Sequence, residues 1–120
     1  MAAETSGRLT VHVLDTARGE PAVDLALSLF RLDGDTRTLL VAQRTNADGR
    51  CAAPLLSGDA LRAGCYEVTF DIASWRTANG EAGVGFYDLI PIRFRVTDAT
   101  AHYHIPLLLS PFGYTTYRGS

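Results

Sequence analysis

Apolar and polar residues alternate along several short segments of the chain, and turn-forming residues separate these segments. In Arg8–Asp15 (RLTVHVLD), Leu9, Val11 and Val13 share one face of an extended strand, because successive side chains of a strand point to opposite faces. Further strand-like runs occupy 25–32, 38–45, 65–72, 92–97, 102–109 and 114–118. Many short strands with turns between them predict an all-β fold, an antiparallel β-sandwich.

The connections between these segments contain turn and helix signals. Asp48-Gly49 supplies residues that tolerate positive φ in a hairpin turn, so we expect Arg50 to begin the returning strand. Residues 73–80 can hold one short helix that ends at a glycine. The further glycines that follow favour an irregular connection up to Pro91.

Length and composition indicate one folded domain. The 120 residues can bury one modest core, and 47% hydrophobic and 20% charged residues exclude disorder. A net charge of −2 without a basic cluster argues against nucleic acid and an anionic membrane surface as partners. No apolar run approaches the ~18 residues that span a bilayer, and the N-terminus lacks the features of a secretory signal. We therefore expect a flexible N-terminus at 1–7, one domain at 8–120, and a cytoplasmic location.

Cys51 and Cys65 are expected to be small buried residues rather than a disulfide or metal ligands.

Three histidines are the natural candidates for proton transfer near neutral pH: His12, His102 and His104. His12 alternates with the apolar residues of its strand and faces away from the core. His102 and His104 share a face that is opposite to that of Tyr103 and Ile105 on the same predicted strand. Their positions fit a surface, an interface, a catalytic site or a zinc site, since three imidazoles can hold a catalytic zinc.

Arg50 and the last four residues, Tyr117-Arg118-Gly119-Ser120, add hydrogen-bonding groups. A guanidinium can bind a planar imide or ureide edge through two parallel hydrogen bonds, provided that Arg50 faces the histidines. The four terminal residues directly follow a strand and a short turn, so they form either a closing edge strand or part of a site. The sequence has no nucleophile elbow and no phosphate loop.

The chain resembles the 5-hydroxyisourate hydrolases of the transthyretin-related family in three segments, 9–22, 45–50 and 102–120. The similarity covers nearly the whole chain, and the combination of His-Tyr-His with a terminal Tyr-Arg-Gly-Ser is specific to the hydrolases. It implies a transthyretin/prealbumin-like sandwich with one short helix and a hydrolase domain at 8–120. The resemblance further implies a site without metal or cofactor, whose residues fall into three groups: catalytic His12, Arg50, His104 and Ser120; substrate-binding His12, Arg50 and Tyr117; supporting His102, Arg118 and Gly119.

The resemblance also implies a reaction and an assembly. The reaction is hydrolysis of 5-hydroxyisourate to 2-oxo-4-hydroxy-4-carboxy-5-ureidoimidazoline in urate breakdown. The assembly is a homotetramer, a dimer of dimers with its sites at the interface between dimers. Three alternatives stay open: a transthyretin-like small-molecule carrier without turnover, a purely structural sandwich, and a zinc-dependent hydrolase. The residues also leave open which histidine is the base.

Overall fold

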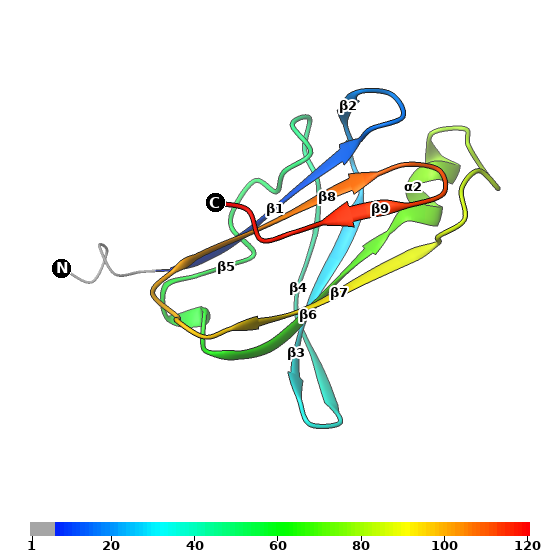
Figure 1. Ribbon diagram of the computed structural model, residues 1–120. Helices are drawn as coiled ribbons and strands as arrows, with labels where there is room; N and C mark the ends of the chain where they lie inside the picture. Colours follow the sequence, from blue (N-terminus) through cyan, green and yellow to red (C-terminus); the bar gives the residue numbers. More distant parts are fainter. Residues whose placement is uncertain (1–6) are drawn as a thin grey trace.

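A computed structural model of the chain describes residues 7–120 (Figure 1). The expected flexible stretch at 1–7 lies outside these residues except for Gly7, which is buried. The elements in chain order are β1 (Arg8–Asp15), β2 (Glu20–Pro21), β3 (Ala26–Asp33), β4 (Thr36–Arg44), β5 (Leu56–Ser57), the 3₁₀ turn η1 (Gly58–Ala60), β6 (Gly64–Asp71), α2 (Ile72–Ala78), β7 (Leu89–Val96), β8 (His102–Leu109) and β9 (Tyr114–Thr116).

The strands form two sheets. One has the order β2-β1-β8-β9, with β5 also paired to β1, and the other has the order β4-β3-β6-β7. The strand pairs in the described residues are antiparallel, except that β1 and β8 run parallel. The prediction of a β-sandwich with one short helix is therefore confirmed. The sheets are antiparallel as predicted, apart from the β1–β8 pair.

The core lies between the two sheets and follows the alternation of the sequence. Leu9, Val11 and Val13 of β1 are buried, whereas the residues between them are only partly covered. Leu27 and Leu29 of β3 meet this layer from the other sheet. Each fully buried aliphatic side chain of this kind contributes about 1.5–3 kcal/mol relative to an exposed one. Because this face of β1 is buried in the core, only its opposite, outward face is available for contacts outside the core.

The helix α2 forms close to the predicted range and covers one end of the sandwich (Figure 1). It begins one residue earlier than expected, because Asp71 caps it by accepting a hydrogen bond from the backbone N–H of Ser74 at 3.1 Å. Trp75 anchors the helix, since its indole N–H donates to the Val23 carbonyl at 3.0 Å and its side chain is buried. No helix in residues 7–120 has the length and apolar character needed to cross a membrane.

The turn at 46–49 is present, but the expected strand after it is not. Arg50 forms only an isolated bridge with His12 of β1, in the sheet opposite to β4. Gly49 has φ +76°, and its carbonyl accepts from the Val13 N–H at 2.8 Å, so the chain turns onto β1 instead of back along β4. The prediction that Arg50 begins a returning strand is therefore wrong.

The two cysteines are both free thiols. Cys51 is half-buried, and Cys65 is exposed because it lies at the start of β6, before the buried part of that strand. The expectation of burial is therefore wrong for Cys65.

Candidate active site

The parallel pairing of β1 with β8 brings two of the three histidine positions beside the outward face of β1. Its register sets Arg8 opposite His102 and Thr10 opposite His104. In both strands the alternating neighbours, such as Leu9 and Tyr103, point into the core. The prediction that the histidines lie away from the apolar core is confirmed, since His12 and His104 are half-buried and His102 is exposed.

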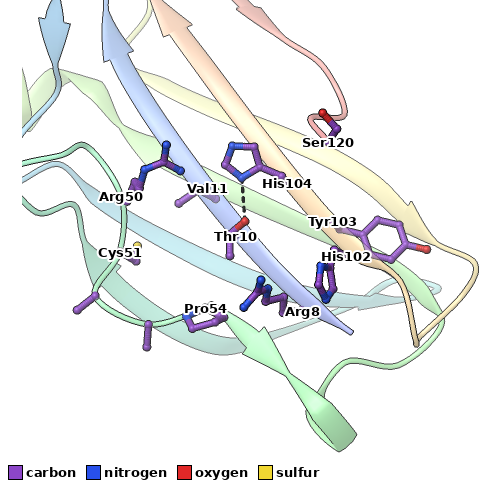
Figure 2. Close-up of a pocket in the computed structure, with 12 residues that line it drawn as sticks. Arg8, Thr10, Val11, Arg50, Cys51, Pro54, His102, Tyr103, His104 and Ser120 are labelled. Atoms are coloured by element: carbon purple, nitrogen blue, oxygen red, sulfur yellow. Dashed lines mark hydrogen bonds between the residues drawn. The ribbon is translucent and has the colours of Figure 1, made fainter. Parts of the chain in front are cut away.

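His104 has a direct partner on the neighbouring strand. Its Nδ1 lies 2.8 Å from the hydroxyl oxygen of Thr10, a contact drawn in Figure 2. Burial lowers the pKa of His104, and the nearby Arg50 guanidinium and His12 lower it further because each disfavours a second positive charge. His104 is therefore neutral near pH 7, which is the protonation state that a general base needs.

His12 has a fixed hydrogen-bond partner of a different kind. Its Nε2 lies 2.9 Å from the main-chain carbonyl oxygen of Asp48. A carbonyl can only accept, so Nε2 of His12 must hold the proton, and the lone pair of the neutral ring is on Nδ1. The rings of His12 and His104 are neighbours, with centroids 6.4 Å apart.

A cavity of about 440 Å³ opens over these strands (Figure 2). Figure 2 shows Arg50 on the loop side of the His104 ring and Ser120 on the side of the terminal residues. His12 is next to His104 but does not line the cavity. The full lining consists of β1, β8 and loop residues together with the last residue: Arg8, Thr10, Val11, Arg50, Cys51, Ala52, Ala53, Pro54, His102, Tyr103, His104 and Ser120.

The residues after β9 run back along β8 (Figure 1). The Gly119 N–H donates to the His104 carbonyl at 2.7 Å, and a Cβ at this glycine would lie only 2.6 Å from Cδ2 of the His104 ring. Arg118 donates to the His102 carbonyl at 3.2 Å and stacks over the Tyr103 ring at 4.4 Å. These contacts hold Ser120 beside the cavity.

The cavity thus unites some of the predicted site residues and not others. Arg50, His104, His102 and Ser120 share it. Tyr117 lines a second cavity, of about 290 Å³, which shares Tyr103 and His104 with the lining of the first.

Sequence reasoning missed Thr10 as a site residue. Its hydroxyl reaches His104 from a strand 94 positions away in the chain. Only the register of β1 against β8 places Thr10 opposite His104, and the alternation of residues within either strand does not reveal that register.

The cavity also contains a thiol and lies near several possible metal ligands. Burial raises the pKa of the Cys51 thiol, so it is protonated near neutral pH and is a poor nucleophile. Within residues 7–120, no group of at least three His, Cys, Asp or Glu side chains is arranged to hold a metal ion.

A family model described as Transthyretin, HIUase/Transthyretin family, matches residues 9–119. The chain belongs to this family. A curated 5-hydroxyisourate hydrolase from Ralstonia nicotianae is 53% identical over 116 residues, which are 95% of this chain and 99% of that protein. The family membership agrees with the sandwich and with the resemblance found in the sequence.

Three solved structures superpose on the fold. A 5-hydroxyisourate hydrolase from Klebsiella pneumoniae is 34% identical with a TM-score of 0.78, and the match covers 95% of this chain and 94% of that chain. A sea bream transthyretin in complex with thyroxine is 32% identical with a TM-score of 0.85, covering 93% and 94%. An (S)-allantoin synthase is 39% identical with a TM-score of 0.89; the match covers all of this chain, which spans only 46% of that protein.

Proposed function

We propose that this member of the HIUase/Transthyretin family hydrolyses 5-hydroxyisourate to 2-oxo-4-hydroxy-4-carboxy-5-ureidoimidazoline. The relative from Ralstonia nicotianae, which matches over nearly its whole length, is named a 5-hydroxyisourate hydrolase. The observation that most supports the activity is that Arg50 and His104 line one cavity. Burial lowers the pKa of His104, which favours the neutral ring. A neutral imidazole beside a guanidinium can activate water next to a bound polar heterocycle.

His104 is the base in this mechanism. Thr10 can accept a hydrogen bond from Nδ1–H of His104, which leaves the lone pair on Nε2. Nε2 then takes a proton from water as the water oxygen attacks the C6 carbonyl of the substrate. A positioned general base of this kind contributes typically ~10²–10⁴-fold to a rate.

Arg50 binds the polar edge of the substrate and stabilises the charge that develops on the C6 oxygen. Its guanidinium offers several N–H donors in a fixed fork. Loss of one donor to a developing oxyanion costs typically ~10²–10³-fold in kcat. Arg50→Gln should therefore lower turnover steeply, with little effect on folding, because this side chain is exposed.

The step balances without a metal or cofactor. One water adds across the N1–C6 bond: its oxygen bonds to C6, the N1–C6 bond breaks, and the proton held by His104 passes to N1. The products of the cleavage are a carboxylic acid at C6, which ionises to the carboxylate by releasing the second proton of the water to solvent, and a ureido nitrogen at N1. Ser120 orients the substrate or the water from the cavity wall, and His12 does so from beside the His104 ring, with the two ring centroids 6.4 Å apart.

We propose roles for the remaining predicted residues from their contacts. Arg118 and Gly119 hold the terminal residues on the carbonyls of His102 and His104. His102 supports the far end of the cavity. Tyr117 contacts substrate from the second cavity, which His104 also lines.

We propose a homotetramer, built as a dimer of dimers, with sites between dimers. The outward face of β1 and β8 presents Thr10, Leu14 and Leu108, which are only partly covered in the single chain. An apolar face of this kind is costly to leave in water, and a symmetry mate packed on it would enclose the cavity. The cytoplasmic location stays a prediction that cell fractionation can test.

A carrier function is the rival. The sea bream transthyretin that superposes on this chain is in complex with thyroxine, so the same sandwich can present a ligand site. A carrier would bind an aromatic ligand saturably and leave the lifetime of 5-hydroxyisourate unchanged.

The test produces 5-hydroxyisourate in the cuvette from urate with urate oxidase and follows its ultraviolet absorbance. The proposal predicts faster decay at catalytic concentrations of the chain, with no loss of rate after addition of a chelator. A decay rate equal to the uncatalysed one, in a sample shown to be folded, would support the carrier. Inhibition by the chelator would support the zinc-dependent alternative.

A further inference from the structure

The turn at 46–50, which follows β4 and leads to the cavity, is closed by both side-chain and backbone hydrogen bonds. The side-chain Oδ1 of Asn46 accepts from two backbone N–H groups, that of Asp48 at 2.9 Å and that of Arg50 at 3.2 Å. Two backbone bonds close the same turn: the Asn46 N–H donates to the Arg50 carbonyl at 2.7 Å, and the Gly49 N–H donates to the Asn46 carbonyl at 2.9 Å. One side chain thus fixes the backbone on both sides of Gly49.

This turn is also joined to β1. The Val13 N–H donates to the Gly49 carbonyl at 2.8 Å, and Nε2 of His12 donates to the Asp48 carbonyl at 2.9 Å. Gly49 has φ +76° and is buried, and a Cβ there would collide with the Val13 carbonyl oxygen. The orientation of the Asp48 carbonyl is therefore set by the turn, and this carbonyl in turn decides which nitrogen of His12 is protonated.

We propose that Asn46 is a positioning residue for the site: its amide oxygen aims the Asp48 carbonyl at His12, holding that ring in the Nε2–H tautomer, and sets the backbone from which Arg50 enters the cavity. Asn46 itself does not line the cavity. It acts on two site residues at once because both depend on the same five-residue turn. The consequence for catalysis rests on the proposed function, whereas the consequence for the His12 tautomer does not.

The expected effects follow from the loss of the two hydrogen bonds to Oδ1. In Asn46→Ala the turn keeps its backbone bonds but loses the two side-chain bonds on either side of Gly49, so the Asp48 carbonyl is held less firmly and neutral His12 should populate both tautomers. Misplacement of a site group by about 1 Å can cost ~10²-fold in rate, so we expect kcat to fall by about 10–10²-fold. The matched variant Asn46→Asp keeps an oxygen acceptor at the same place and should restore most of kcat.

The experiment has a structural arm and a kinetic arm. Nitrogen-15 spectra of the His12 ring, recorded where it is neutral, should show a single Nε2–H form in the wild type and in Asn46→Asp, and a mixture in Asn46→Ala. Asp71→Ala is the stability control, because it removes the cap of α2, far along the chain from the turn; removal of such a cap typically costs about 1 kcal/mol. This control should leave kcat unchanged.

The outcomes separate the two proposals. An unchanged His12 tautomer in Asn46→Ala would overturn the positioning role, as would equal losses of kcat in Asn46→Asp and Asn46→Ala. A wild-type chain that does not accelerate 5-hydroxyisourate decay, yet shows the tautomer change in Asn46→Ala, would overturn the proposed reaction and leave the positioning role of Asn46 intact.

Discussion

At the level of single residues, the proposed chemistry depends on the protonation of one imidazole, that of His104. Burial, Arg50 and His12 act in the same direction on its pKa and keep the ring neutral. His12 differs, because a main-chain carbonyl fixes the position of its proton. Two histidines with centroids 6.4 Å apart thus have different environments, which is the usual way in which paired titratable groups acquire separate roles.

The pH dependence of the reaction follows from the lowered pKa of His104. A base must be unprotonated, so kcat/KM should stay level as the pH falls through the usual histidine pKa of about 6.5 and should decline only at lower pH. The check is a pH profile of kcat/KM, corrected at each pH for spontaneous decay. An acid limb centred at or above pH ~6.5 would contradict the role given to His104.

Gly119 leaves no room for a side chain. Because its Cβ would lie 2.6 Å from the His104 ring, Gly119→Ala should displace either the ring or the terminal residues and lower kcat by about 10-fold or more. Gly113→Ala is the matched control, since its nearest contact would be Ser110 Oγ at 3.7 Å. Equal kcat values for the two variants would show that the packing of Gly119 on His104 has no catalytic importance.

At the level of secondary-structure elements, the site depends on pairings that join distant parts of the chain. Alternation alone predicts β8 at 102–109 with the observed bounds and assigns the inward residues of β1 correctly. It cannot predict that β1 and β8 are parallel neighbours, because the register is set by packing across the whole sandwich. The prediction of a returning strand after Gly49 is wrong for the same reason, since the turn residues alone do not reveal that the Gly49 carbonyl bonds to Val13 of β1.

The contact between Thr10 and His104 is the direct product of the β1–β8 register. Thr10→Val keeps the shape of the side chain but removes the hydroxyl, so Nδ1 of His104 loses its partner. We expect kcat to fall by about 10–10²-fold, a part of the ~10²–10⁴-fold typical of a general base, while the melting temperature changes little. Steady-state kinetics and thermal unfolding of the same sample test this. An unchanged kcat would exclude Thr10 from the mechanism.

Removal of Tyr117–Ser120 tests the segment that follows β9. The truncated chain keeps both sheets and their core, because none of these four residues belongs to the core. It loses the contacts of Gly119 with His104 and of Arg118 with His102, together with Ser120 in the cavity. We expect stability near that of the full chain with activity reduced by about 10²-fold or more. Retained activity would identify this segment as a simple edge strand.

At the level of the whole molecule, the cavity of about 440 Å³ opens on the outward face of β1 and β8, whose residues are partly exposed in the single chain. Sedimentation equilibrium at assay concentrations should give the mass of four chains of 13.0 kDa. His12→Glu would place a carboxylate on the proposed contact face and should shift the assembly toward smaller species. A fully active monomer would contradict a site completed by a second dimer.

The central claim is that His104 acts as a base in the hydrolysis of 5-hydroxyisourate, and its most direct test compares the wild type with His104→Asn. The ultraviolet decay of freshly generated 5-hydroxyisourate is followed with equal concentrations of each folded protein. The account predicts rapid decay with the wild type and a rate lower by ~10²–10⁴-fold with the variant, after the spontaneous rate is subtracted. Equal rates for the two proteins would contradict it.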